Sequence, residues 1–129
     1  MIKVALDSID ALNARFEGVG PEEIVRFVYE DADLHPILGT SFQADGSVLI
    51  HMIFHVGNPF DVFFMDTRKH IPETYAFADL MEKTYPAMSL NRGAYLESDD
   101  EFNAKHGAGL WERDPTLCCN LRKVEPLAD

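Results

Sequence analysis

The sequence has little cysteine, little positive charge and no long hydrophobic run, and each shortage excludes a class of protein. Its 129 residues include only two cysteines, which are adjacent and cannot form the disulfide framework of a small secreted protein. Eleven basic residues against 22 acidic ones give a net charge of −11, which argues against nonspecific nucleic-acid binding. No apolar run approaches the roughly 20 residues that a membrane helix needs. Asp7 and Asp10 come too early for the apolar core of a signal peptide. We therefore expect a cytoplasmic protein with no membrane or nucleic-acid partner.

The remaining composition is that of a folded protein. Hydrophobic residues make up 47% and charged residues 26% of the chain, both ordinary values for a globular domain. A chain of this length has room for one domain, and no linker or repeat divides it. We therefore expect residues 1–129 to form a single domain.

Hydrophobic spacing and helix-capping signals predict an alternation of strands and helices. The predicted elements are a helix over 21–29, a strand over 37–41, a helix over 48–55 capped by Ser47, a strand over 61–66, a helix over 72–85 and a strand over 87–91. Residues 92–113 read as irregular, and the acidic run 97–101 as a solvated loop. This order indicates an α/β fold, with a parallel sheet flanked by helices.

Two polar loops follow predicted strands, at residues 41–47 and 66–70. Since ligands of parallel sheets bind beyond the carboxyl ends of the strands, these loops could frame one pocket. Backbone N–H groups after 41–47 would favour a phosphate or sulfate. The 66–70 loop carries three basic or titratable side chains and a threonine hydroxyl, which suit an anion. The alternatives are a plain connecting loop and a solvated turn capped by Asp66 or Thr67.

The most specific pattern lies over residues 114–123, where Asp114 is a good N-cap and a proline follows it. Cys118 and Cys119 then lie near the positive end of a helix, which favours thiolates. At a spacing of four, Cys118 faces Arg122 and Cys119 faces Lys123. Thiolates beside cations suit a metal–sulfur cluster near an anionic substrate, and the alternative is a buried cysteine pair.

Two further features carry less chemistry. His51 and His55 share a helix face, but the residues between them are apolar and lack the usual glutamate, which disfavours zinc. Trp111 and the phenylalanines are expected in the core.

Three segments together resemble the assimilatory sulfonucleotide reductases, which are the adenylylsulfate and phosphoadenylylsulfate reductases. Residues 40–45 (TSFQAD) look like the modified PP-loop of that family. Residues 62–75 (VFFMDTRKHIPETY) resemble its Asp-Thr-Gly…Pro-Glu-Thr-Tyr segment. Residues 109–127 end in CCNLRKVEPL and resemble its highly specific double-cysteine segment. The segments occur in the family's order and span residues 36–127.

The resemblance implies a parallel sheet of the adenine-nucleotide α-hydrolase (PP-loop) type. It also implies reduction of adenylylsulfate to sulfite and AMP, with thioredoxin as the electron donor. Cys118 and Cys119 would be two of the four ligands of a 4Fe–4S cluster, and the pair favours adenylylsulfate over phosphoadenylylsulfate. Lys123 would lie between cluster and sulfate and support catalysis through its charge. The implied substrate-binding residues are Ser41, Phe42, Gln43, Ala44, Asp45, Ser47, Thr67, Lys69, Arg122 and Lys123.

Two departures from the family pattern affect these expectations. Arg68 stands where the family has glycine, which alters the turn after Thr67 because other residues adopt positive φ less readily. Family enzymes also continue beyond the double-cysteine segment, with further cysteines that include the nucleophile. Since this sequence has no third cysteine, we expect a truncated fold, no catalytic nucleophile and no activity of the chain alone. Two chains in a homo-oligomer would together supply four cluster ligands.

Three other functions compete with this interpretation. The first is an inactive adenine-nucleotide-binding module that kept the pocket without the redox step. The second is an ATP pyrophosphatase of the PP-loop group, such as an ATP sulfurylase subunit, although residues 42–44 replace the Gly-Gly-Lys of its loop. The third is a structural zinc protein that uses the cysteines with histidines.

Overall fold

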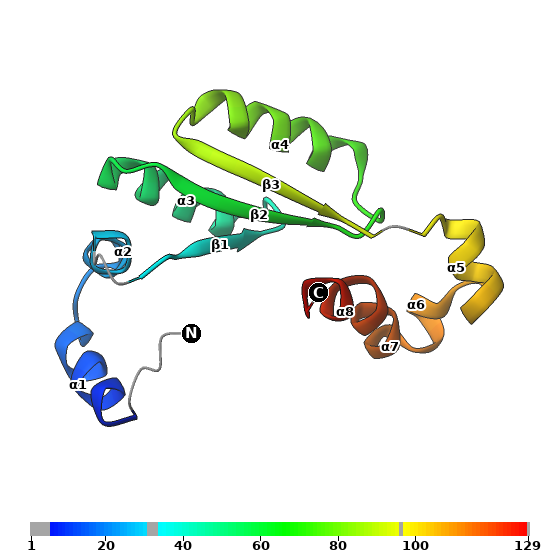
Figure 1. The fold of residues 1–129 in the computed structure, drawn as a ribbon, viewed down its shortest axis with the longest axis horizontal. Coiled ribbons are helices and arrows are strands. Elements are labelled where there is room, and N and C mark those ends of the chain that lie inside the picture. The colour runs from blue at the N-terminus through cyan, green and yellow to red at the C-terminus, as the bar shows by residue number, and fades with distance from the viewer. Residues whose placement is uncertain (1–5, 31–33, 96, 129) are drawn as a thin grey trace.

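The computed structural model describes residues 6–30, 34–95 and 97–128 (Figure 1). Its elements are α1 (Leu6–Phe16), α2 (Pro21–Glu30), β1 (Ile37–Thr40), α3 (Ala44–Val56), β2 (Phe60–Asp66), α4 (Pro72–Thr84), β3 (Met88–Ala94), α5 (Asp99–His106), α6 (Leu110–Arg113), α7 (Pro115–Cys119), the π-helical segment η1 (Asn120–Val124) and α8 (Glu125–Ala128). All the strands and helices expected from residues 21 to 91 are present, within a few residues of their predicted ends.

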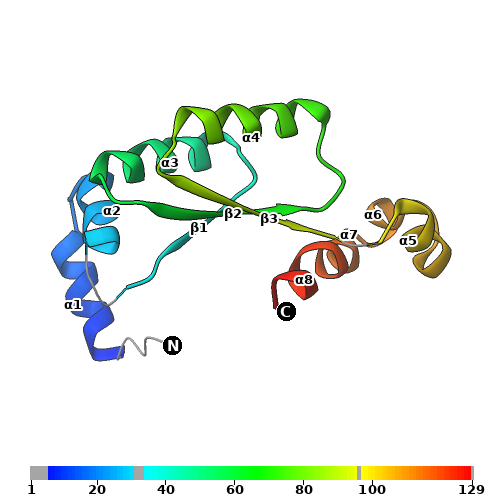
Figure 2. The same ribbon diagram turned by 45° about the horizontal axis from the view of Figure 1, so that its top comes forward.

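The three strands form one parallel sheet in the order β1-β2-β3. Because each crossover is right-handed and the sheet grows in one direction, α3 and α4 must lie on the same face. Figure 2 shows both helices over that face. The predicted parallel α/β architecture is therefore confirmed, and the carboxyl ends of β1 and β2 meet at one edge of the sheet.

The core lies between the sheet and this helical layer. Alternate residues of the central strand β2, namely Phe60, Val62 and Phe64, are buried, as the two-residue period of a strand requires. They meet Ile50 and Ile53 of α3, with other apolar residues of α3 and α4 in the same cluster. Burial of these side chains holds the two loops at the ends of β1 and β2 in place.

The start of α3 differs from the prediction. The helix begins at Ala44, with Gln43 as its N-cap and no side-chain cap. Ser47 lies within the first turn, where its N–H and its hydroxyl both donate to the Gln43 carbonyl. The expectation that Ser47 caps this helix is wrong, because the chain already turns at Gln43. The end is as predicted: Gly57 adopts φ 95° and its N–H bonds to Phe54.

Residues 92–113 are more regular than predicted. Strand β3 extends to Ala94, and α5 and α6 follow. The acidic run is not a solvated loop but the start of α5, where Ser98 and Glu101 form a capping box. Its carboxylates lie at the positive end of the helix dipole, which stabilises them there.

Helices α5 to α8 form a second group beyond the carboxyl end of β3, whereas α1 lies at the opposite end of the molecule (Figure 1). None of the helices in the described residues is long and apolar enough to span a membrane. The second group carries the double-cysteine segment, so the edge of the sheet faces the residues with the most specific chemistry.

Candidate functional site

The turn after β2 is held by its own side chains. Asp66 Oδ1 accepts hydrogen bonds from the Arg68 N–H (2.7 Å) and from the Tyr75 hydroxyl (2.7 Å). Thr67 is 5% exposed, and its hydroxyl accepts a hydrogen bond from the Lys69 N–H at 3.4 Å. Both alternatives for the cap, Asp66 and Thr67, thus contribute. The turn places Lys69 on the side of the sheet where the C-terminal helices lie. Contacts described below join this turn to those helices.

Arg68 adopts φ 58°, so the backbone here is left-handed although the residue is not glycine. A residue with a side chain pays roughly 1–2 kcal/mol of folding free energy to adopt this conformation. Glycine avoids that cost, but it loses more conformational entropy on folding, which cancels part of the benefit. We expect Arg68→Gly to raise the free energy of unfolding by about 1 kcal/mol, measured by urea denaturation. The matched control is Lys83→Gly within α4, which should lower stability by about 1 kcal/mol. Equal effects of the two substitutions would contradict the role of φ.

The segment with the cysteines begins as predicted and then departs from a regular helix. The Asp114 carboxylate accepts a hydrogen bond from the Leu117 N–H at 3.0 Å, and Pro115 occupies the first turn of α7. From Asn120 the chain winds as a π-helix through Val124. Such turns are rare and frequently occur at functional sites. The buried residue of this turn is Arg122.

Arg122 ties the C-terminal helices to the turn after β2. It is 3% exposed, and its Nη1 donates to the Thr67 carbonyl at 3.1 Å. Its guanidinium carbon lies 3.9 Å from the centre of the Phe102 ring and 5.1 Å from that of Tyr95. The hydrogen bond to Thr67 joins residues 55 positions apart in the chain, so it fixes where η1 lies relative to the sheet.

Asp99 completes this cluster from α5. Its Oδ1 accepts from Arg122 Nη2 at 3.1 Å and its Oδ2 from Lys69 Nζ at 2.5 Å. The hydrogen bond from Lys69, followed by that from Arg122, holds the pKa of Asp99 below its usual range despite some desolvation. Asp99 was not predicted as a site residue, although the capping box that positions it is visible in the sequence as Ser98-x-x-Glu101.

A cavity of about 550 Å³ lies between the turn after β2 and the C-terminal helices. It brings together two of the three segments that the sequence singled out. Its cations come from both segments, and its two thiols are free, with Cys118 half-buried and Cys119 exposed. The lining residues are Thr67, Lys69, His70, Phe102, Asn103, Gly109, Leu110, Trp111, Cys118, Cys119, Arg122 and Lys123.

Trp111 contradicts the expectation that it belongs to the core. Its side chain is 61% exposed and lines the cavity. The reason is that α6 is a single turn that buries only Leu110, so the next side chain, about 100° further round the helix, faces outward. A one-turn helix has no apolar periodicity from which this orientation could be predicted.

The loop 41–47 does not line this cavity, so only the second of the two loops frames it. The Phe42 N–H donates to the Thr40 hydroxyl at 2.9 Å, and Phe42 adopts φ 58°. Its ring is buried against Phe64, with centroids 5.2 Å apart. The phenyl group of Phe42 therefore belongs to the core, and only its backbone remains for a ligand. The binding roles of Ser41, Phe42, Gln43, Ala44, Asp45 and Ser47 stay predictions.

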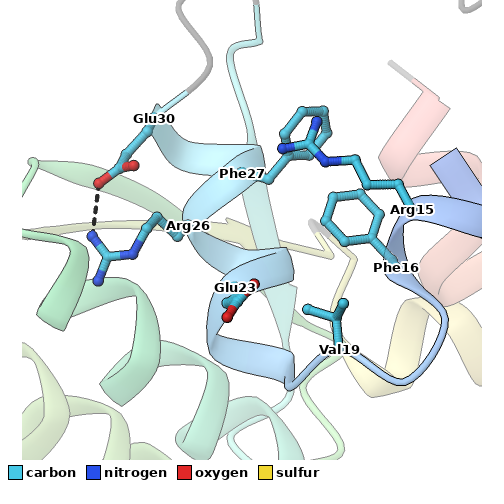
Figure 3. A pocket seen from close by; sticks show the side chains of 7 residues that line it. All are labelled: Arg15, Phe16, Val19, Glu23, Arg26, Phe27 and Glu30. Carbon is cyan, nitrogen blue, oxygen red and sulfur yellow. Dashed lines mark hydrogen bonds and ion pairs between the residues drawn. The ribbon is translucent and has the colours of Figure 1, made fainter.

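Two other features lie away from the cavity. His51 and His55 have ring centroids 4.3 Å apart, but the described residues contain no group of three or more metal-ligating side chains. A second cavity of about 540 Å³ lies between α1 and α2 (Figure 3). Arg15 lies 4.7 Å from the Phe27 ring there, and Arg26 pairs with Glu30. None of the predicted site residues lines this second cavity.

The tyrosine bound to Asp66 makes stability depend on alkaline pH. Burial, followed by the hydrogen bond to Asp66, raises the pKa of Tyr75 from 10.0 to about 12. The folded protein keeps this phenol neutral where the unfolded chain ionises it, so its contribution is complete below pH 10 and is lost as the pH rises towards 12. Tyr95 contributes in the same direction. We expect the urea midpoint to fall between pH 9 and 11.5, and to fall less steeply in Tyr75→Phe. If the urea midpoint fell equally steeply with pH in both proteins, Tyr75 would not be the source of the pH dependence.

Comparison with known proteins identifies the family. Residues 35–129 match the phosphoadenosine phosphosulfate reductase domain. The chain is 34% identical over 110 residues to adenosine 5'-phosphosulfate reductase from Oceanobacillus iheyensis. The aligned region covers 85% of this chain and 46% of that protein. It is 34% identical over 123 residues to the enzyme of that name from Bacillus cytotoxicus, covering 92% and 51% of the two chains.

A solved structure shows the same fold. The crystal structure of phosphoadenylyl-sulfate reductase from Candida auris, in a phosphate complex, matches with a TM-score of 0.79 and 31% identity. The match covers 98% of this chain and 62% of that one. The chain spans about half the length of the curated relatives it matches. By sequence and by fold, the chain belongs to the phosphoadenosine phosphosulfate reductase family.

Proposed function

We propose that these residues form the substrate-binding part of a thioredoxin-dependent, cytoplasmic sulfonucleotide reductase that converts adenylylsulfate to sulfite and AMP. The observation that carries the proposal is the cavity that gathers Lys69, Arg122 and Lys123 around Cys118 and Cys119. The family and the names of the relatives support a sulfonucleotide as the substrate. The reduced thioredoxin dithiol would supply two electrons and become a disulfide, while the bond between the sulfur and the phosphate oxygen breaks and releases sulfite and AMP.

The cavity suits the sulfate end of such a substrate. Arg122 is held rigidly by the Thr67 carbonyl and by Phe102, so its position does not depend on a ligand. Lys69 and Lys123 are exposed long side chains on the cavity, so they can adjust to the position of an anion. Fixed and adjustable cations together can balance the charges of a phosphosulfate group at little reorganisation cost. Lys123 would stabilise the negative charge on the sulfate oxygens.

The adenosine would lie towards the loop after β1. Ser41 and Gln43 are exposed at the start of α3, a helix of 13 residues whose first N–H groups have no intrahelical partner. The parallel sheet supports this placement, since β1 and β2 end at the same edge. The nucleotide would then bridge the 41–47 loop and the cavity.

The two thiols fit part of an iron–sulfur ligand set. Cys118 and Cys119 are free, adjacent and on the cavity beside two cations, but no third metal-ligating side chain joins them within the described residues. We propose that they supply two of the four thiolates of a 4Fe–4S cluster, with the others coming from a second copy of the chain or from residues outside this sequence. Such a cluster would supply a redox-active centre whose charge is tuned by Lys123.

A nucleotide-binding module without redox chemistry is the second candidate. The observation that favours it is that, among the described residues, no third metal-ligating side chain joins Cys118 and Cys119. Both candidates predict the same binding site, and they differ in whether iron is bound.

The test combines binding, iron content and product release on anaerobically purified protein. We expect adenylylsulfate to bind with a Kd in the micromolar range, and Lys123→Ala to weaken it about tenfold, or roughly 1.4 kcal/mol. Lys83→Ala, an exposed lysine on α4, is the matched control and should leave the Kd unchanged. We expect these residues alone to release no sulfite. Absence of sulfonucleotide binding would refute both candidates.

Iron and acid-labile sulfide per chain, measured with the native mass, separate the two candidates. Stoichiometric iron and sulfide in a homo-oligomer would support a cluster shared between copies. An iron-free monomer that binds adenylylsulfate would support the binding module instead.

A further inference from the structure

Asp99 occupies a special place beside the cavity, because it binds two of the cavity's cations without lining the cavity itself. Lys69 lies 2.5 Å and Arg122 3.1 Å from its two carboxylate oxygens. An anion entering the cavity would meet these same two cations. The carboxylate and such an anion therefore share their partners.

The two cations differ in how firmly they are bound to Asp99. Arg122 is buried, and it also bonds to the Thr67 carbonyl, so it cannot follow a ligand. The side chains of Lys69 and Asp99 are 46% and 50% exposed. Ion pairs between exposed side chains are weak and exchange readily with other partners. Lys69 is thus the cation that can be drawn away from Asp99.

Asp99 itself is held in place. It is the first residue of α5 and lies within the Ser98–Glu101 capping box, and the positive end of the helix stabilises its charge. Among the described residues, Asp99 is the carboxylate that forms an ion pair with the buried Arg122. The carboxylate therefore stays with Arg122 when Lys69 leaves.

We propose that Asp99 sets the affinity of the site by competing with the sulfate or phosphate group of the ligand for the ammonium of Lys69. Binding must first break the Lys69–Asp99 pair, so the observed affinity is the intrinsic affinity reduced by the fraction of Lys69 that is free. For the sulfonucleotide this inference rests on the proposed function. For an inorganic anion the inference does not rest on the proposed function, since it requires only the side chains of Lys69, Asp99 and Arg122.

The test compares Asp99→Asn with Asp100→Asn, which removes the same charge from the next, exposed position of α5. Calorimetric titration with adenylylsulfate should show binding about 3–10 times tighter for Asp99→Asn, and a change below about twofold for Asp100→Asn. In a Lys69→Met background the gain from Asp99→Asn should vanish, because the competed cation is gone. Weaker or unchanged binding by Asp99→Asn would show that Asp99 only positions the cations, and would overturn the proposal.

Inorganic sulfate separates this inference from the proposed function. The rise in Tm with sulfate should be larger for Asp99→Asn than for the unsubstituted chain, because sulfate then binds Lys69 without competition. Equal rises would overturn the inference even if adenylylsulfate binds. A larger rise without adenylylsulfate binding would refute the proposed function and support the inference. Asp99→Glu keeps the charge and should behave like the unsubstituted chain, which controls for loss of folding.

Discussion

Arg122→Leu is expected to lower the free energy of unfolding by about 2–3 kcal/mol and to abolish anion binding in the cavity. The substitution removes charge-assisted hydrogen bonds to the Thr67 carbonyl and to Asp99, each worth roughly 1.5–3 kcal/mol when buried. Asp99 is half exposed, so water hydrates the carboxylate that remains and the loss stays below that for a fully buried pair. Leucine keeps part of the packing on Phe102.

The measurement is urea denaturation followed by circular dichroism, together with titration of sulfate. The matched control is Lys123→Leu, the neighbouring cation in the same π-helical turn. Because Lys123 is exposed, its replacement should change stability by no more than about 0.5 kcal/mol. A similar loss of stability in both variants would show that Arg122 does not join the C-terminal helices to the sheet.

Gly46→Ala is expected to lower the free energy of unfolding, although helix propensity alone would predict that it raises it. Alanine in the first turns of a helix normally gains up to about 1 kcal/mol over glycine. Here a Cβ at position 46 would lie 2.3 Å from the Thr40 hydroxyl, which accepts the Phe42 N–H. We expect a loss of about 1–3 kcal/mol, as for overpacked sites, and weaker nucleotide binding through displacement of the 41–47 loop.

Two variants test the cause of this loss. Gly39→Ala places a Cβ where no atom lies within 4 Å and should change stability by less than about 0.5 kcal/mol. Thr40→Val puts a methyl group where the hydroxyl was and keeps the close contact, whereas Thr40→Ala removes it. Thr40→Ala should therefore make the added cost of Gly46→Ala smaller. An additive double variant would contradict the steric explanation.

The elements with strong local signals are the ones that could be predicted. Pro21, Gly57 and Pro72 mark helix boundaries through their own backbone restrictions. The strand over 61–66 could be predicted because its sequence is mostly apolar, as is typical of buried parallel strands. Helix α5 has no apolar periodicity and buries only Phe102, so composition suggested a loop. Its capping box was the local signal that could have corrected this.

The sequence by itself determined the strand–helix alternation and the family motifs, because each depends on residues within a few positions of one another. Only the tertiary structure decided that Phe42 belongs to the core, that Trp111 faces the cavity, and that Asp99 joins Lys69 to Arg122. Lys69 and Arg122 lie 30 and 23 positions from Asp99, beyond the range of any periodic pattern. Contacts of this kind form where separate elements meet in space, and side-chain spacing along the chain does not encode which elements those are.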